Sequence, residues 1–197
     1  YLTVGDAEAR MNLLLSGAAD VLAAAGTVSS VARITADKRV RVYPMPTTTV
    51  GYLSFNQRDP ADLSRPHPIL SDPAVRAAIG KALDRRGMVQ ATFGSWASVP
   101  EGPVPQLFWI RDPGFKPAAA DPAGARAQLR ARGWIDSNGD GVLDKNGAPL
   151  ALTLNYPSQD ATRGQLALQI QEQLRQVGIR IEINRLDGPV WVEQRNR

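Results

Sequence analysis

Apolar residues recur at helical spacing in several segments that begin at a capping residue. The clearest starts at Asp72-Pro73, since an aspartate cap followed by proline in the first helical position is a strong helix start. Val75, Ile79 and Leu83 then fall on one face of that helix. Long helices are predicted over residues 73–85, 121–132 and 161–177, and shorter ones over 7–16, 27–36, 88–93 and 187–195.

Other stretches alternate apolar and polar residues, which is the pattern of a half-buried strand. Ile179, Ile181 and Ile183 give the clearest example. Strands are expected over residues 20–22, 40–43, 50–56, 150–154 and 179–184, with a hairpin between 136 and 154. Because strands alternate with helices, the predicted fold class is α/β, with packed helices on a mixed β-sheet.

The longest stretch without a clear period runs from Gly94 to Pro122 and is rich in proline and aromatic residues. A loop of this length in a compact domain is usually functional. Large amphipathic side chains in such loops and at strand ends often line small-molecule clefts, although they can also anchor a loop to the core. The candidate ligand-binding residues are Tyr52, Asn56, Trp96, Trp109 and Tyr156.

The amino-acid composition limits the classes of protein to which this chain can belong. The chain has 197 residues, 43% of them hydrophobic and 21% charged, which is an ordinary globular mixture. It has no stretch of about 18 apolar residues that would predict a membrane span. It does not begin with Met, and we expect its ends to be cuts within a longer protein. The net charge of +4 would suit an anionic partner, but the cations are dispersed, so no nucleic-acid partner is expected.

Catalytic signals are weak. The chain contains no cysteine, which excludes thiolate metal sites, cysteine nucleophiles and disulfides. His67, the only histidine, lies between prolines and far from any nucleophile motif. Glu101 and Asp112 flank the aromatic loop, but nothing in the sequence places them together as a glycosidase pair. The chain is therefore predicted not to be an enzyme, with no cofactor and no metal site.

One motif resembles a calcium loop. Asp136-x-Asn138-x-Asp140-Gly141 supplies oxygens at alternate positions, as an EF-hand does. The twelfth position, which should hold a bidentate acid, is Gly147. Since Asx-Gly runs are also common in hairpin turns, a turn that does not need calcium is predicted, and a calcium site stays open as the alternative.

Several stretches, taken in order, resemble one family. The most specific is Asp72-Pro73-x-Val75-Arg76-x-Ala78-Ile79-x-x-Ala82-Leu83-Asp84-Arg85. The others are Asp6-x-x-x-Arg10 through Leu15-Ser16-Gly17-x-x-Asp20-Val21, Tyr52-Leu53-x-Phe55-Asn56, Gly102-Pro103-x-Pro105, Gly133-Trp134-x-Asp136 through Gly147, and Ile170-Gln171-x-x-Leu174-x-x-Val177-Gly178-Ile179. Over nearly the whole chain they resemble the extracellular solute-binding proteins, family 5, of ABC importers, which include the oligopeptide-, dipeptide- and nickel-binding group.

The resemblance implies a type II periplasmic-binding-protein fold with two lobes around a cleft. It implies that residues 1–197 are a single domain, the second lobe, and that the first lobe lies outside this chain. The implied function is that of the solute-binding component of an ABC importer, in which this lobe is one jaw of a hinged cleft for peptides or similar small solutes. Family members bind ligands as different as peptides, nickel complexes, haem, opines and oligosaccharides, so the ligand is not implied.

The implied partners are the solute, the first lobe of the same protein and an ABC permease in the membrane. The implied location is the periplasm or the cell exterior, with a lipoprotein anchor in a missing N-terminal segment. In relatives a Trp-x-x-Asp-type segment that helps to hold the ligand follows the last helix, and Trp191 is too early to correspond to it. The alternative is the sensor domain of a transcription regulator whose helix-turn-helix lies outside this chain; an enzyme on the same fold has no support in the sequence.

Overall fold

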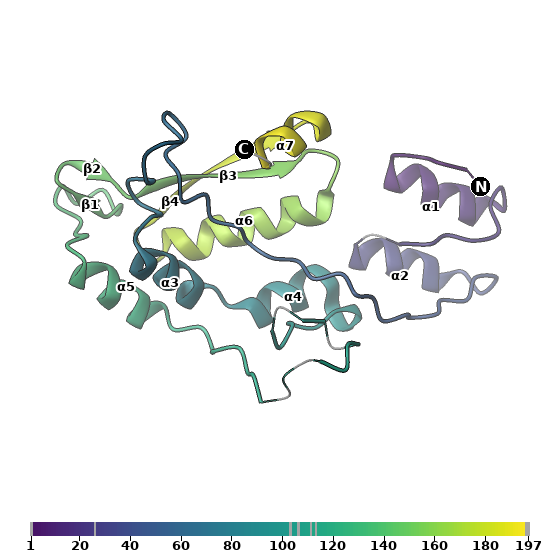
Figure 1. Ribbon diagram of the computed structural model, residues 1–197. Helices are drawn as coiled ribbons and strands as arrows, with labels where there is room; N and C mark the ends of the chain where they lie inside the picture. The colour runs from purple at the N-terminus through teal and green to yellow at the C-terminus, as the bar shows by residue number, and fades with distance from the viewer. Residues whose placement is uncertain are drawn as a thin grey trace.

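A computed structural model describes residues 2–25, 27–102, 104–105, 107–110, 112 and 114–195, with Arg195 in its backbone only. A central helix, α6 (Ala161–Arg175), separates the main strands from the other helices of the main body (Figure 1). The strands β3 (Ala151–Pro157) and β4 (Arg180–Leu186) pack on one side of α6. Helices α3 (Pro73–Ala82), α4 (Arg85–Phe93) and α5 (Pro122–Ala131) lie along the other side. The α/β prediction is confirmed.

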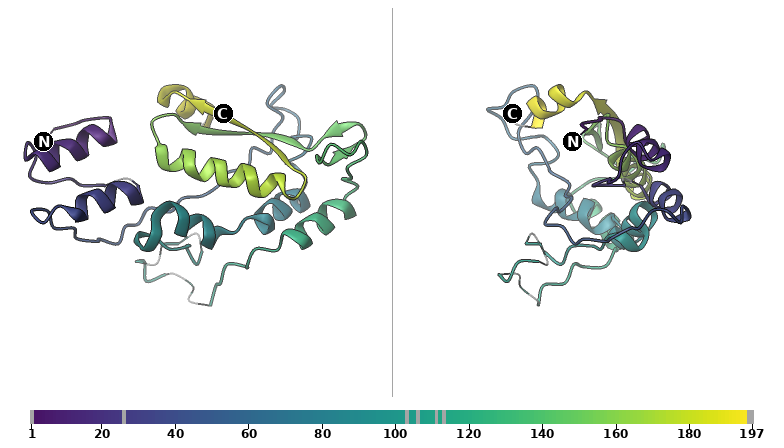
Figure 2. Two further views of the ribbon diagram at one scale, coloured as in Figure 1. Left: turned by 180° about the vertical axis from the view of Figure 1, so that it is seen from behind. Right: turned by 90° about the vertical axis from the view of Figure 1, so that its right-hand side faces the viewer.

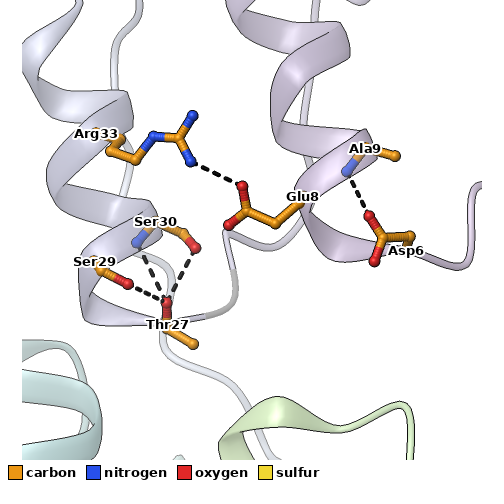
Figure 3. Close-up of polar contacts among 7 residues, drawn as sticks. All are labelled: Asp6, Glu8, Ala9, Thr27, Ser29, Ser30 and Arg33. Carbon is orange, nitrogen blue, oxygen red and sulfur yellow. Dashed lines mark hydrogen bonds and ion pairs between the residues drawn. The ribbon is translucent and has the colours of Figure 1, made fainter.

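The first two helices form a pair that stands beside this body (Figures 1 and 2). Helix α1 spans Ala7–Ser16 and α2 spans Val28–Ala36, as the sequence predicted. Figure 3 shows how they are held: Glu8 and Arg33 form an ion pair of 2.8 Å across the helices. The Thr27 hydroxyl oxygen caps α2 by accepting a hydrogen bond from the Ser30 N–H (3.3 Å).

The connection from α2 to α3 is extended and contains no strand. The predicted strands over 40–43 and 50–56 are therefore wrong as assigned, and residues 20–22, between α1 and α2, form no strand either. Residues 50–56 do keep the alternating burial of a strand, because Leu53 and Phe55 pack against the core while Tyr52 and Ser54 are exposed. What they lack is a paired neighbour, and a strand is defined by its ladder of hydrogen bonds.

The helix predicted over 73–85 is two helices. Leu83 leaves helical geometry with a ψ of 120°, and the Asp84 carboxylate then accepts a hydrogen bond from the Gly87 N–H (3.0 Å). Asp84 is thus the N-cap of a new helix, α4, rather than part of a C-terminus. After the single 3₁₀ turn η1 (Gly94–Trp96), the described residues up to Asp121 form no helix or strand, which agrees with the predicted long loop.

The C-terminal half contains a hairpin and a parallel strand pair. The hairpin joins β1 (Asp144–Lys145) to β2 (Ala148–Pro149) through Asn146 and Gly147, whose φ values of 53° and 78° suit a tight turn. Strand β3 pairs in parallel with β4, and α6 is the crossover between them. The last helix, α7, spans Gly188–Arg195 and packs against β3.

The two faces of the β3–β4 pair differ in chemistry. Leu152 and Leu154 lie opposite Ile181 and Ile183 and belong to the core face. The neighbouring positions of each strand are polar and exposed on the outer face: Thr153, Asn155, Glu182 and Asn184. The main core joins this apolar face to α3, α5 and α6, with Val75, Ile79, Leu129, Leu150, Leu174 and Ile179 almost completely buried.

Candidate functional site

The carboxyl ends of β3 and β4 bring polar and aromatic side chains together. Parallel strands end at the same edge, and in open α/β sheets the crevice outside that edge is the usual ligand site. Tyr156 is the second-to-last residue of β3 and is paired with Arg185 of β4. The next residues, Ser158 and Asp187, make a hydrogen bond of 3.4 Å between their side chains. A backbone bond from the Ser158 N–H to the Leu186 carbonyl oxygen (2.8 Å) keeps the two strand ends side by side.

Helices α6 and α7 both begin at this edge and add a cation and an indole ring. The guanidinium of Arg163, in the first turn of α6, lies 5.1 Å from the centre of the Trp191 ring of α7. It also contacts the carboxylate of the N-cap Asp160 at 3.2 Å. The guanidinium thus stacks on the indole ring in a cation–π contact while its charge is paired with Asp160.

A short amide network continues from this edge onto the outer face. The Asn184 side-chain amide donates to Asn155 Oδ1 (2.9 Å), and Asn155 in turn donates to Gln194 Oε1 of α7 (3.3 Å). These three amides hold α7 against the outer face of the strands. They therefore help to hold α7, the helix that carries Trp191, beside β3.

The sequence-predicted ligand residues lie on several separate segments. Tyr156 is half-buried at the strand edge described above, with its hydroxyl oxygen close to Gly164, 3.2 Å from an ideal Cβ at that position. Tyr52 is 82% exposed in the extended connection. Asn56 is also exposed and accepts a hydrogen bond from the Arg58 N–H (3.0 Å).

The two predicted tryptophans lie on segments other than β3, which carries Tyr156. Trp96 ends the 3₁₀ turn after α4 and is 47% exposed, whereas Trp109 in the long loop is 92% exposed. In Figures 1 and 2, α6 and α4 lie between that loop and β3. This chain therefore does not gather the predicted residues into one cluster, and their joint role as ligand contacts stays a prediction.

The sequence analysis did not name Arg163, and it considered Trp191 only as too early for the Trp-x-x-Asp-type segment of relatives. The parallel pairing places both residues. Arg163 lies in α6 shortly after the carboxyl end of β3, and Trp191 lies in α7 shortly after the carboxyl end of β4. The available signal was positional: a β-α-β-α order puts the first turn of α6 and of α7 at the same edge. The sequence predicted that order, but only the structure shows that β3 and β4 are paired neighbours.

The calcium-like loop forms a turn whose oxygens are already engaged. Asp136 accepts hydrogen bonds from the N–H groups of Gly139 (2.7 Å) and Gly141 (3.0 Å). The N–H and hydroxyl of Ser137 donate to Asp144 and hold the pKa of that carboxyl below its usual range. Among the residues that the structure describes, no group of three or more His, Asp or Glu side chains could hold a metal ion.

The residues considered for catalysis have local structural roles. His67 Nδ1 accepts hydrogen bonds from the N–H groups of Ile69 and Leu70, both at 3.0 Å, and so holds the turn before α3. Partial burial lowers the pKa of His67, against the opposing charge of Asp59. Glu101 pairs with Lys116 at 3.0 Å, and Asp112 accepts a hydrogen bond from the Gly114 N–H (2.8 Å).

Comparison with known proteins identifies the family. The family described as bacterial extracellular solute-binding proteins, family 5 Middle, matches residues 1–197. This chain is a family 5 solute-binding protein. The match confirms the resemblance inferred from the sequence, and the family is one of solute-binding proteins, not enzymes.

The relatives of this family 5 chain include proteins named for several solutes. It is 30% identical over 148 residues to the oligopeptide-binding protein AppA of Bacillus subtilis, covering 74% of this chain and 26% of AppA. It is 27% identical over 183 residues to the probable ABC transporter periplasmic-binding protein SapA of Escherichia coli, covering 91% of this chain and 29% of SapA. Both names describe binding proteins, and neither supports the transcription-regulator alternative.

Solved structures agree with the family 5 assignment. The structure of AppA from Bacillus subtilis in complex with a nonapeptide matches with a TM-score of 0.73 and 27% identity, over 98% of this chain and 36% of AppA. NikA from Brucella suis in complex with Fe(III)-EDTA matches with a TM-score of 0.60 and 29% identity, over 66% of this chain and 26% of NikA. This family 5 chain thus has the fold of type II periplasmic binding proteins, and it spans between 26% and 36% of the length of these relatives.

Within the described residues of this family 5 chain, no helix is both long enough and apolar enough to cross a bilayer.

Proposed function

We propose that this chain forms one jaw of the solute cleft in the binding protein of an ABC importer. The observation that carries the proposal is the group of polar and aromatic side chains at the carboxyl ends of β3 and β4. Tyr156, Arg163, Trp191 and Asp187 there offer a ring, a cation, an indole and a carboxylate at one edge. Family membership over residues 1–197 supports it.

The solute that suits this edge best is a peptide or a similar small molecule. The cation of Arg163 complements a carboxylate, the carboxylate of Asp187 complements an ammonium group, and the rings of Tyr156 and Trp191 complement apolar side chains. The names of two relatives, an oligopeptide-binding protein and a peptide transport protein, favour the same class. Tyr52, Asn56, Trp96 and Trp109, which lie on other segments of this jaw, are kept as proposed contacts for parts of the solute that extend beyond this edge.

The mechanism proposed is closure of a hinged clamp. A solute that contacts both jaws only in the closed form binds that form more tightly, and this difference shifts the population toward closure. The closed form then docks on the membrane permease. The partners are the other lobe of the same protein and the permease, and the site of action is the periplasm or the cell exterior, with a lipoprotein anchor as a further proposal.

The test is calorimetry on this chain extended to the length of its relatives, titrated with a mixture of short peptides. Tyr156→Ala and Trp191→Ala should each weaken binding by about tenfold or more, which corresponds to about 1.4 kcal/mol. The control is Ile135→Ala, because Ile135 is 54% exposed and lies beside the β1 end of the molecule, away from the proposed edge. If peptides bind and neither variant weakens them, the edge is not the cleft; if no peptide or other family solute binds, the function itself is wrong.

A further inference from the structure

The chain contains two Asn-Gly dipeptides, and they differ in how the structure holds them. They are Asn138-Gly139, in the turn that resembles a calcium loop, and Asn146-Gly147, in the β1–β2 hairpin. Glycine has no Cβ, so no side chain shields its backbone nitrogen from the asparagine before it. That nitrogen can attack the amide carbon of the asparagine, which makes Asn-Gly prone to spontaneous deamidation. All four residues are exposed, so exposure alone does not distinguish the two sites.

Hydrogen bonds hold both reacting groups of the first site. The Gly139 N–H donates to Asp136 Oδ1 (2.7 Å), and the charge of that carboxylate opposes loss of the proton from the nitrogen. The Asn138 side chain accepts from the Asp140 N–H (3.1 Å) and donates to Asp140 Oδ2 (3.1 Å). Ring closure needs the nitrogen to lose its proton and the asparagine side chain to rotate toward it. At this site both changes require hydrogen bonds to be broken.

The second site has neither restraint. Within the described part of the chain, no hydrogen bond involves the Asn146 side chain or the Gly147 N–H. The strands that flank this turn have two residues each, and Pro149 has no N–H to donate across to Asp144. Few hydrogen bonds must therefore open for the Asn146 side chain and the Gly147 nitrogen to approach each other.

We propose that Asn146 is the site at which this protein deamidates and that Asn138 is protected. The Gly147 nitrogen loses its proton to water or hydroxide and forms a bond to Cγ of Asn146. The bond from Cγ to Nδ2 breaks, and the nitrogen leaves as ammonia after it takes a proton from water. Water then opens the cyclic imide at either carbonyl carbon, which gives aspartate or isoaspartate. Nothing is oxidised or reduced, and water is the only co-reactant.

The two products differ in their effect on the hairpin. Both add a negative charge beside Lys145, whose Nζ lies 6.0 Å from the centre of the Trp134 ring. Aspartate accepts the φ of 53° at this position and can keep the turn. Isoaspartate adds a methylene to the main chain, which a tight turn cannot absorb without shifting the Lys145–Ala148 pair. In Figures 1 and 2 the hairpin and α7 lie at different ends of the main body, so the inference is independent of the proposed solute edge.

Peptide mapping by mass spectrometry tests the proposal on the chain extended to the length of its relatives, incubated without solute at mildly alkaline pH. Trypsin cleaves after Lys145 and so places the two asparagines on different peptides, and fragment spectra distinguish Asn146 from Asn155. In the folded protein Asn146 should deamidate at least about tenfold faster than Asn138, because the Asn138 site must first break its hydrogen bonds. In denaturant the two rates should become similar. Equal rates in the folded protein, or a difference that persists in denaturant, would contradict the proposal.

Variants of the protected site provide a second readout. Asp136→Ala removes the carboxylate that holds the Gly139 N–H, so deamidation of Asn138 should rise toward the rate of Asn146. Asp140→Ala frees the Asn138 side chain but leaves the Gly139 N–H bound, and it should give a smaller rise. The Asn146 rate in the same samples is the internal control and should not change. If the Asn138 rate stays low in Asp136→Ala, the hydrogen bond does not protect it and the proposal is wrong.

Discussion

At the scale of single residues, side-chain caps determine where most helices begin. Carboxylate or hydroxyl oxygens accept hydrogen bonds from the first turn of α1, α2, α3, α4, α5 and α6, at the positions Asp6, Thr27, Asp72, Asp84, Asp121 and Asp160. Each cap satisfies an N–H group that the helix itself leaves without a partner. Asp72 has a second role, since its other oxygen accepts from Arg132 Nε at 2.9 Å.

The double role of Asp72 predicts a pH dependence of stability. The hydrogen bond from Arg132 and that from the Ala74 N–H hold the pKa of Asp72 below its usual range. A carboxylate whose pKa is lower in the folded state stabilises it above the unfolded pKa of about 3.9, and this contribution is lost as the pH falls further. Asp72→Asn keeps an acceptor for the cap but loses the charge, so its Tm should lie below that of the parent at pH 7, and the gap should narrow toward pH 3.

The measurement for Asp72 is thermal unfolding followed by circular dichroism between pH 7 and pH 3. Asp72→Ala should lose about 1 kcal/mol at neutral pH, because the cap is also removed. Glu182→Gln, which neutralises an exposed carboxylate on the outer face of β4, is the control. A gap between parent and Asp72→Asn that stays constant with pH would show that the ion pair does not contribute.

Two glycines with similar backbone angles allow the cost of backbone strain to be distinguished from the cost of steric overlap in the core. Gly178 and Gly139 have φ values of 84° and 78°, which disfavour any L side chain. An added Cβ at Gly178 would lie 2.6 Å from Leu143 Cγ, whereas at Gly139 nothing lies within 4 Å. Gly139→Ala should cost about 1 kcal/mol from the backbone alone. Gly178→Ala should cost about 1–3 kcal/mol more, because it overpacks the core.

Denaturant unfolding of these two variants measures the difference. Leu143 is the group that must move, so Leu143→Ala should recover part of the loss in the Gly178→Ala background. Equal losses for the two single variants would mean that the space between Gly178 and Leu143 can accommodate a methyl group.

At the scale of elements, burial of one helix face determines how α3 and α6 pack. Ile79 of α3 is 1% exposed in the core, whereas Ile170 of α6 is partly buried at its margin. Ile79→Ala should cost about 2–5 kcal/mol of unfolding free energy, and Ile170→Ala an amount near the lower end of that range. Leu168→Ala on the 60% exposed face of α6 should change stability by less than about 0.5 kcal/mol. Near-parental melting of both isoleucine variants would contradict the packing described here.

The turn from Asp136 to Gly147 should not depend on calcium. Its carboxylates already accept hydrogen bonds from backbone N–H groups, and the twelfth position of the motif is a glycine. Calcium added up to millimolar concentration should leave the Tm unchanged. Because a ligand that binds only the native state raises stability by mass action, a shift that saturates at micromolar calcium would disprove this prediction.

At the scale of the whole molecule, residues 1–197 alone should bind solute only weakly. A cleft normally encloses about 70–90% of its ligand, and one jaw covers a smaller share. Each lost factor of ten in affinity corresponds to about 1.4 kcal/mol, so losing several contacts moves a micromolar site to millimolar or beyond. Calorimetry of this chain against a peptide mixture and nickel complexes measures it. A dissociation constant at or below about a micromolar would show a self-sufficient binding unit and would overturn the single-jaw proposal.

The prediction that residues 1–197 form one lobe depends on how α1 and α2 are packed relative to the main core. The main core runs from Leu53 to Ile183, while α1 and α2 pack on each other beside it. The buried apolar residues of that pair are Met11 and Ile34. The assignment of residues 1–197 to a single lobe therefore stays a prediction.

The sequence by itself determined the helices, the α/β class and the family. These follow from signals that act within one or two turns: caps such as Asp72 and Asp121, C-terminal glycines such as Gly17, and apolar spacing along one face. Such signals need no distant partner, so they can be read from the chain alone. The local cap at Asp84 was read as a helix end only because an aspartate, by itself, fits the end of one helix and the start of the next.

Only the tertiary structure decided which strands pair and which side chains meet. Strand pairing joins β3 to β4 across the whole of α6, and residues 50–56 show that an alternating pattern does not supply a partner. Arg163 and Trp191 meet because α6 and α7 start at one edge, which depends on that pairing. A strand's hydrogen bonds are non-local, whereas a helix makes its own within four residues, and this difference explains why the helices were predictable and the candidate site was not.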